Sequence, residues 1–413
     1  MDKLGKLVYR NPDLLFMYKG VVGCPPLQMV DDVLAVQNCS ERSQRMNTTI
    51  NTFMELEKLT LSKKKCHKIH IGKHHRECPD LYVHGAIMAE SKSEKYLGDI
   101  VHSSGSIKPN LAKRLSRGWG KVSEIMAIVK EAPLGHYRIM AGLILRKAML
   151  HNTMLCNSEA WHGFNLSQVK AFEKIDEALI RGLVQGHAKI AIPALYLETG
   201  QIPVRFILAC RRIQFLHTIL ARDSDELIYK VYQAQKVDPT QGDFCELVEN
   251  DFKLLNLQLS EESLKSMSSV DLKCLLKGKS KEEAFKYLME IKETKSKLDN
   301  ISYLNSFKTL KYIQVMSREQ SSLLLALKTR TVRGIRSDFG EMFPDKQCPL
   351  QNCQELDSLP HLLACRELQG EAWRSPEVQF ADVYSEDLER QLEVTRLYSQ
   401  LLAVRERLLL PPD

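Results

Sequence analysis

The sequence has no long apolar run, no low-complexity segment and no regular cysteine framework. Because no run reaches the ~18 apolar residues of a membrane span, we expect no membrane anchor. The first residues, Met1-Asp2-Lys3-Leu4, lack the apolar stretch of a secretory signal, so the sequence predicts a protein that is not secreted. The 11 cysteines follow no even spacing, which favours an intracellular, reducing compartment with free thiols or a metal site rather than disulfides.

The composition does not indicate disorder. Hydrophobic residues make up 44% of the chain and charged residues 26%, which are ordinary values for a globular protein. The length of 413 residues suffices for two or three domains, so most of the chain can bury a core.

Positive charge is concentrated in the first third of the chain. Residues 1–150 contain 24 Lys and Arg against 14 Asp and Glu, a net charge of +10, whereas the remainder contains 34 and 37, a net charge of −3. Seven of the 12 histidines also lie in this first third. A basic surface of this kind suits an anionic partner such as nucleic acid, and the alternative is an ordinary solvated lysine-rich face.

The pattern of apolar residues predicts a small mixed region followed by a long helical one. A hairpin, a helix over 40–59 and short strands near 66–71 and 95–100 are expected first. From about residue 111 onwards, apolar residues recur at helical spacing, which is typical of a helical core. The predicted fold class is therefore α+β, predominantly helical.

Two adjacent aspartates lie between two short apolar runs, 27–30 and 33–36. We expect these runs to form a buried hairpin, in which Asp31 and Asp32 would be costly unless they bind cations or donors. Carboxylate oxygens suit Mg²⁺, and two such ions about 3.5–4 Å apart can stabilise both oxygens of a nucleotidyl transfer. The alternative is a plain Asp-Asp turn between strands.

Three motifs in order resemble a known family. Residues 26–36 resemble the palm hairpin of reverse transcriptases, with Met29 and Val30 where that family has an aromatic residue and a variable one. Residues 59–66 look like its next motif, in which Lys65 matches a lysine, and Tyr96-Leu97-Gly98 is similar to the primer grip. Together they resemble the reverse transcriptase of a non-LTR retrotransposon, an RNA-directed DNA polymerase.

The resemblance extends over most of the chain. Residues 111–221, including the motifs at 155–161 and 196–203, look like the thumb and post-thumb region of these polymerases. The resemblance implies an RNA template and a DNA primer as partners, and a nuclear location. It also implies five segments: a partial palm (1–105), a helical thumb-like domain (106–230), a helical connection (231–345), a zinc-knuckle-like segment (346–366) and C-terminal helices (367–413).

The resemblance also implies roles for single residues. Asp31 would ligate Mg²⁺ with Asp32 beside it, and Lys65 would lie near the leaving pyrophosphate, unless Lys65 is only a solvated lysine. The family site needs a third carboxylate from an earlier palm strand and fingers that precede this hairpin. Among the 30 residues before Asp31, Asp13 lies in a turn beside Pro12 and is a poor substitute, and no fingers are present. We therefore expect little or no polymerase activity without the missing amino-terminal half. The alternatives are a non-catalytic nucleic-acid-binding remnant and a helical protein with no retained function.

Two groups of cysteines and histidines are candidate metal sites. Cys348, Cys353, His361 and Cys365 follow a C-x4-C-x7-H-x3-C pattern, which suits tetrahedral Zn²⁺, although related knuckles space the first pair by two residues. The alternative is a decayed knuckle with free thiols. The second group is expected to be a polar strand and a basic loop that touches phosphates rather than a metal site; it comprises Cys66, His67, His70, His74, His75 and Cys78.

Overall fold

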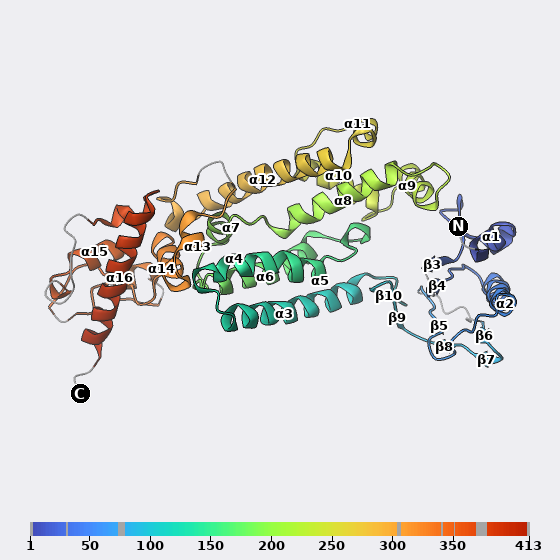
Figure 1. Cartoon of the computed structure of the whole chain (residues 1–413), viewed down its shortest axis with the longest axis horizontal. Helices are drawn as coiled ribbons and strands as arrows, with labels where there is room; N and C mark the ends of the chain where they lie inside the picture. Colours follow the sequence, from blue (N-terminus) through green and yellow to red (C-terminus); the bar gives the residue numbers. More distant parts are fainter. Residues whose placement is uncertain are drawn as a thin grey trace. The chain divides into compact units, whose positions relative to one another are not determined.

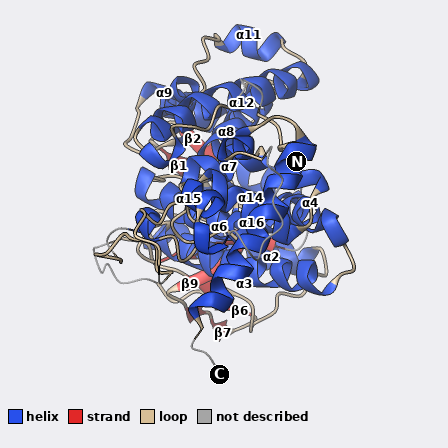
Figure 2. Cartoon of the chain, turned by 90° about the vertical axis from the view of Figure 1, so that its left-hand side faces the viewer, coloured by secondary structure: helices blue, strands red, loops and turns tan. Residues whose placement is uncertain are grey.

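The computed structural model of the chain describes residues 3–29, 32–72, 79–303, 307–339, 342–350, 352–368 and 378–410 (Figure 1). Helices make up most of these residues and the strands are short (Figure 2). The predicted predominantly helical α+β fold class is therefore confirmed. In the part of the chain that is described, no helix is both long enough and apolar enough to cross a lipid bilayer.

The helices include several long ones after the first hundred residues. Their bounds are α1 Lys3–Tyr9, α2 Ser40–Leu56, α3 Lys108–Glu131, α4 Arg138–Leu145, α5 Asn152–Met154, α6 Leu166–Leu183, α7 Ile192–Thr199, α8 Val204–Leu220, α9 Leu227–Val237, α10 Phe244–Leu254, α11 Glu261–Ser266, α12 Ser269–Glu293, α13 Lys311–Val315, α14 Arg318–Lys328, α15 Leu359–Ala364 and α16 Leu388–Leu409.

The strands pair only in twos within the described residues. Their bounds are β1 Phe16–Tyr18, β2 Val22–Cys24, β3 Leu27–Met29, β4 Asp32–Leu34, β5 His67–Lys68, β6 Tyr82–Val83, β7 Ala86–Ile87, β8 Ala89–Glu90, β9 Ser93–Tyr96 and β10 Asp99–His102. Four pairs are antiparallel hairpins, β1–β2, β3–β4, β6–β7 and β9–β10, and β5 pairs with β8 in parallel.

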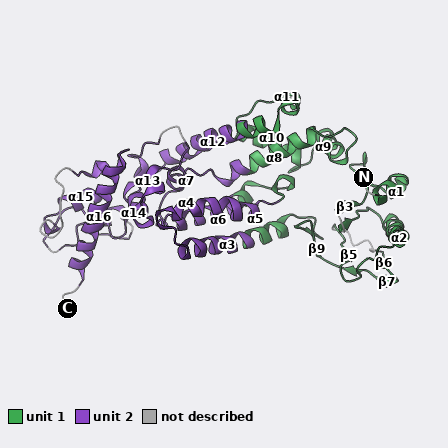
Figure 3. Cartoon of the chain, in the orientation of Figure 1, with its two compact units in different colours: residues 1–116, 157–169, 208–274 green, residues 117–156, 170–207, 275–413 purple. Residues whose placement is uncertain are grey.

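The chain divides into two compact units, each assembled from segments that are distant in the sequence (Figure 3). Unit 1 comprises residues 1–116, 157–169 and 208–274, and unit 2 comprises residues 117–156, 170–207 and 275–413. The units follow spatial proximity rather than sequence order. The five segments expected from the sequence remain a prediction.

In unit 1, the amino-terminal helix and α2 share a small apolar core. Asn11 and Pro12 follow the end of α1, because proline cannot continue the helical hydrogen bonds. The chain then returns so that both helices bury one side against the turn between them. The buried members of this core are Leu4, Val8, Leu14, Leu15 and Met46.

One part of the helical region expected after residue 111 is irregular in the structure. It is divided into α4, a π-helical turn at Arg146–His151 and α5. The wider π turn brings Arg146 and His151 onto one buried side, where both contact the same carboxylate, Asp176. A polar contact made in the tertiary structure thus explains an irregularity that apolar spacing did not predict.

The expectation of a buried Asp-Asp hairpin was wrong. Leu27 is 41% exposed and Met29 is 57% exposed, although both belong to β3. The reason is that β3 pairs with β4 alone among the described strands, so no further sheet covers its faces.

Candidate nucleic-acid interface and metal centre

Of the aspartate pair, the structure describes Asp32, which belongs to the β3–β4 hairpin. Met29 pairs with Asp32, so Asp32 opens β4 as an exposed strand residue and not as a turn residue. Asp31 lies outside the described residues, as does Val30. The hairpin therefore presents the Asp32 carboxylate to solvent at its tip, where a hydrated cation has access to it.

The Tyr-Leu-Gly motif forms the turn of the β9–β10 hairpin. Leu97 and Gly98 have φ angles of 46° and 94°, as in a tight turn whose two central residues are both left-handed. The Tyr96 hydroxyl donates a hydrogen bond to the Leu27 carbonyl at 3.2 Å. Burial, and then the charge of Asp32, raises the pKa of Tyr96. Two motifs that are separate in the sequence thus meet in unit 1.

A polar clamp holds the β9–β10 hairpin. Asp99 Oδ1 accepts hydrogen bonds from Arg114 at 2.8 Å and Asn110 at 2.9 Å, and its Oδ2 accepts one from Asn157 at 2.9 Å. Asn157 also donates to the Leu97 carbonyl at 3.1 Å. Asn157 belongs to the 155–161 motif, so a third stretch of the family resemblance contacts this hairpin. The spacing of residues does not predict this clamp, because its side chains come from separate segments of the sequence.

The position of Lys65 can be compared with Asp32 alone, because Asp31 lies outside the described residues. Lys65 lies exposed in a turn closed by hydrogen bonds from the amides of Lys65 and Cys66 to the Ser62 carbonyl. No hydrogen bond or ion pair between described residues joins Lys65 to Asp32. Its role near pyrophosphate stays a prediction.

The second cysteine and histidine group is only partly described. His67 belongs to the short strand β5, which the sequence predicted to be polar, and it contacts Glu94 at 3.1 Å. His74, His75 and Cys78 lie outside the described residues.

In unit 2, the 196–203 motif supplies buried polar groups. Asp176 is fully buried and accepts two hydrogen bonds of 2.6 Å from Arg146, one of 2.9 Å involving His151 and one of 3.0 Å from Tyr196. Gln201 accepts a further bond from Arg146 at 2.8 Å. Burial alone would raise the pKa of Asp176, but the Arg146 charge and the His151 contact hold it well below its usual range.

The same motif joins α7 to later segments of unit 2. Glu198 is fully buried and accepts hydrogen bonds from Tyr303 at 3.1 Å and Lys328 at 3.3 Å. The next residues make backbone contacts, since Thr309 donates to the Thr199 carbonyl at 2.8 Å. The polar side chains of this motif therefore organise the core of unit 2.

The predicted zinc ligands converge. Ligand atoms of Cys348, Cys353, His361 and Cys365 all lie within 4.8 Å of one another, and we call these four residues the Cys-His cluster. Cys353 Sγ is 3.3 Å from His361 Nε2. Three sulfurs and one imidazole nitrogen at this separation could hold a tetrahedral metal ion such as zinc.

Local backbone geometry explains how the cluster forms. Gln347 and Leu356 make an antiparallel bridge, which closes the loop that carries the first two cysteines. Ser358 caps α15 by accepting a hydrogen bond from the His361 amide at 3.3 Å, so the helix begins where it presents the histidine. Tyr398 of α16 anchors α15 by donating to the Leu359 carbonyl at 2.9 Å.

Burial disfavours the ionised form of the Cys348 and Cys365 thiols. Burial, with a further contribution from the neighbouring cysteines, raises the pKa of Cys348 to about 12 and also raises the pKa of Cys365. Several buried thiols that touch one another cannot all ionise without a positive charge among them. A bound metal ion would supply that charge, and the four side chains of the Cys-His cluster would hold it.

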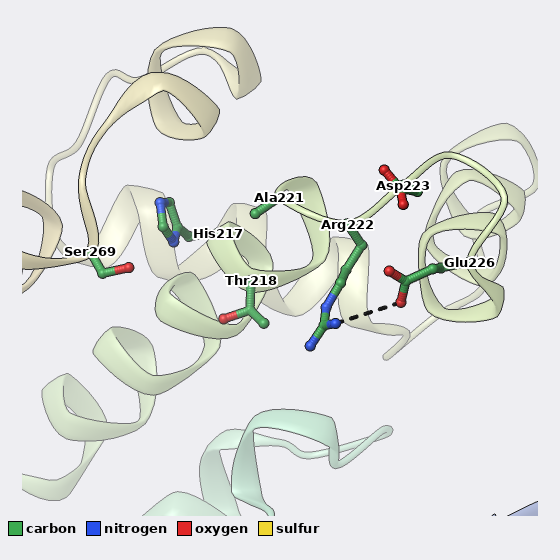
Figure 4. A pocket seen from close by; sticks show the side chains of 7 residues that line it. All are labelled: His217, Thr218, Ala221, Arg222, Asp223, Glu226 and Ser269. Carbon is green, nitrogen blue, oxygen red and sulfur yellow. Dashed lines mark ion pairs between the residues drawn. The ribbon is translucent and has the colours of Figure 1, made fainter. Parts of the chain in front are cut away.

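A surface hollow of about 340 Å³ lies elsewhere in unit 1 and contains none of the predicted site residues (Figure 4). His217 and Arg222 lie on its walls; His217 contacts the Met267 carbonyl at 2.9 Å, and Arg222 contacts Glu226 at 3.7 Å. The His217 imidazole and the Arg222 guanidinium therefore already have partners.

Comparisons of this chain with models of protein families, with curated proteins and with solved structures found no match. The candidate sites therefore rest on their own residues and geometry.

Proposed function

We propose that this chain is part of a reverse transcriptase of the non-LTR retrotransposon type. It would bind an RNA template with a DNA primer, with Mg²⁺ held at Asp31 and Asp32. The observation that carries the proposal is the hydrogen bond from Tyr96 to Leu27, because it joins the primer-grip-like hairpin to the aspartate hairpin. By the same resemblance, the protein would act in the nucleus.

The clamp around Asp99 supports this proposal. Arg114 and Asn157 hold the β9–β10 hairpin from α3 and from the 155–161 motif. A hairpin that positions a primer end must keep its place relative to the metal ligands, since small displacements of reacting groups reduce rates strongly.

Metal binding by the aspartate pair gives the direct test. Mn²⁺ serves as a spectroscopic substitute for Mg²⁺. With a primed RNA template bound, the Asp31→Asn, Asp32→Asn variant should bind fewer Mn²⁺ ions than the wild-type protein. The matched control is Asp223→Asn with Asp225→Asn, two exposed carboxylates of unit 1, and it should bind Mn²⁺ as wild type does. Electron paramagnetic resonance reports the free Mn²⁺. Equal Mn²⁺ binding by both variants would contradict the metal role.

A second candidate function is non-catalytic nucleic-acid binding, and the geometry of the Cys-His cluster favours it. Because this chain is expected to have little or no polymerase activity without an amino-terminal half, primer extension with Mg²⁺ on an RNA template separates the two candidates when the amino-terminal half of a related polymerase is supplied. Extension that Asp32→Ala abolishes favours the polymerase. Binding of the primed template without extension favours the second candidate.

We propose Zn²⁺ as the ion of the Cys-His cluster. Its role would be structural, because four protein ligands complete a tetrahedral site and leave no open position. Metal analysis of the purified protein should find one equivalent of zinc, lost in Cys365→Ser. Cys274→Ser replaces an exposed cysteine of α12 and should retain the zinc. Wild-type protein without zinc would contradict the assignment.

A further inference from the structure

A concentration of positive charge surrounds the ring of Phe339 in unit 2. Lys189 Nζ lies 4.8 Å from the ring centroid and Lys297 Nζ lies 5.2 Å from it. The imidazole of His187 stands edge-on to the same ring, with the centroids 5.3 Å apart. Each contact is a favourable use of the aromatic quadrupole, and together they collect cations from distant parts of the chain.

Hydrogen bonds fix these side chains in place. The Arg181 guanidinium donates to the carbonyls of His187 at 2.7 Å and Ile190 at 3.0 Å, which holds the loop after α6. The Lys297 ammonium donates to the carbonyls of Arg330 and Asp338, which joins the segment before Phe339 to the turn after α12. The charges are therefore presented by a built scaffold.

His187 adds a directed donor. The Lys189 amide donates to His187 Nδ1 at 3.1 Å, so Nδ1 acts as an acceptor and the neutral ring carries its proton on Nε2. Burial, and then the charges of Arg333 and Lys189, lowers the pKa of His187. At neutral pH the imidazole is therefore an uncharged N–H donor among cations.

The cations of this region outnumber the carboxylate beside them. Within the described residues, no ion pair joins Lys189, Lys297, Arg330 or Arg333 to a carboxylate. Asp338 is the acidic neighbour of Lys297 and Arg330, and burial raises its pKa to about 6, so it is largely ionised at neutral pH and offsets one of the positive charges. The remaining positive charges repel one another, so an anionic ligand would stabilise the arrangement.

The region is connected to the segment that carries the Cys-His cluster. The amides of Arg336 and Ser337 donate to the side chain and the carbonyl of Asp357, at 2.8 and 3.0 Å. Asp357 is fully buried and forms a 2.8 Å ion pair with Arg405 of α16. Within unit 2, Asp357 therefore links the segment that carries the Cys-His cluster both to residues 336–337 and to α16.

We propose that His187, Lys189, Lys297, Arg330 and Arg333, which we call the Phe339 cluster, bind the phosphodiester backbone of a nucleic acid. Arginine forks and lysine ammonium groups match phosphate oxygens, and the His187 N–H adds a neutral donor. Phe339 itself is only 4% exposed, so it offers no ring for base stacking or for insertion into a lipid surface. The contact is therefore with the backbone and is independent of sequence.

This inference rests on the proposed function for the class of its partner, and its test does not involve the aspartate pair. Lys189 and Arg333 are both exposed, so Lys189→Gln with Arg333→Gln removes two charges without disturbing the core. The matched control, Lys279→Gln with Lys286→Gln, removes two charges from α12, where both lysines pair with Glu282.

Fluorescence anisotropy with a labelled oligouridine, measured over a range of KCl concentrations, gives the readout. The cluster variant should lose affinity on the order of tenfold at low salt, and the slope of log K against log salt should fall by about 1.4, because two phosphate contacts are removed. The control variant should keep the wild-type slope. Equal losses in both variants, or none in the cluster variant, would overturn the proposal.

Four further measurements control for folding, for charge, for lipid binding and for the aspartate pair. Thermal unfolding checks that both variants fold, and Lys189→Arg with Arg333→Lys should restore oligouridine binding because both charges are kept. Phosphatidylserine vesicles test the lipid alternative: vesicle binding that only the cluster variant loses, with oligouridine binding unchanged, overturns the nucleic-acid partner. The Asp31→Asn, Asp32→Asn variant should keep its oligouridine affinity, so a failed polymerase proposal leaves this result interpretable.

Discussion

At the residue scale, two buried carboxylates of unit 2 each accept more than one hydrogen bond. Asp176 receives hydrogen bonds from Arg146 and Tyr196, and Glu198 receives them from Tyr303 and Lys328. A buried charge without such partners costs several kcal/mol, so removal of one partner is more damaging than an ordinary surface change. The polar residues of the 196–203 motif are therefore explained by the stability of the core.

Gly200 is the position of this motif where a side chain cannot be accepted. Its φ angle is 63°, and a Cβ there would lie 2.2 Å from the Thr309 backbone nitrogen. Gly200→Ala should lower the free energy of unfolding by about 2–4 kcal/mol, since both the backbone and the contact are strained. Urea denaturation measures the change.

The control for this substitution is Gly278→Ala in α12. No atom lies within 4 Å of a Cβ built at Gly278, so alanine should raise the free energy of unfolding by about 0.5–1 kcal/mol through helix propensity. A similar loss in both variants would show that the close contact at Gly200 is not the cause.

Glu177 should make stability depend on pH. Burial, and then the charges of Glu173 and Asp176, raises its pKa from 4.5 to about 7. A carboxyl whose pKa is raised by folding favours the folded state at low pH, and this contribution is lost as pH rises towards 7. Glu177→Gln stays neutral, so it should be more stable than wild type at pH 8 and about equally stable at pH 4.

Urea denaturation at both pH values measures this difference. Glu290→Gln, an exposed change on α12, should follow the wild-type pH dependence. A constant difference between Glu177→Gln and wild type across this range would contradict the raised pKa.

At the element scale, short hairpins depend on side chains from outside their own strands. A two-stranded hairpin is marginal in water without further packing. β9–β10 is held by Arg114, Asn110 and Asn157, whereas β3–β4 has the Tyr96 hydroxyl as an external hydrogen-bond donor. We therefore expect the β9–β10 hairpin to position the β3–β4 hairpin.

Asn157 tests this dependence. Asn157→Gly keeps the left-handed backbone, with φ of 60°, but removes both side-chain hydrogen bonds to the β9–β10 hairpin. Local stability of β9–β10 should fall by about 1–2 kcal/mol, seen as faster amide hydrogen exchange at 93–102. Asn152→Gly removes a local helical hydrogen bond in unit 2, and it should leave exchange at 93–102 unchanged.

At the scale of the whole molecule, metal loss should have a confined effect. The Cys-His cluster, the Asp357–Arg405 ion pair and the Tyr398 hydrogen bond tie the metal segment to α16 within unit 2. Because ion binding stabilises the state that binds it, removal of the ion should weaken this part of unit 2 first.

Hydrogen exchange with and without a chelator measures the extent of the effect. Residues 342–350, 352–368 and α16 should exchange faster after metal removal, while α1 and α2 of unit 1 should not change. Cys365→Ser should reproduce the chelator pattern. Uniform faster exchange over both units would show instead that the ion stabilises the whole fold.

The sequence by itself determined the features that depend on local spacing. Apolar periodicity predicted α2 and the helical character after residue 111, because helix formation responds to neighbours three and four residues away. The spacing of Cys348, Cys353, His361 and Cys365 predicted a ligand set, and the structure brings these four residues together.

Only the tertiary structure decided which distant side chains meet. No spacing pattern in the sequence predicts that Lys189 and Lys297 lie close together, yet both contact the ring of Phe339. The exposure of the Asp-Asp hairpin and the buried contact of Arg146 with Asp176 also depend on long-range packing. Periodicity shows which side of an element is apolar, whereas the partner of a buried charge depends on how the chain closes on itself.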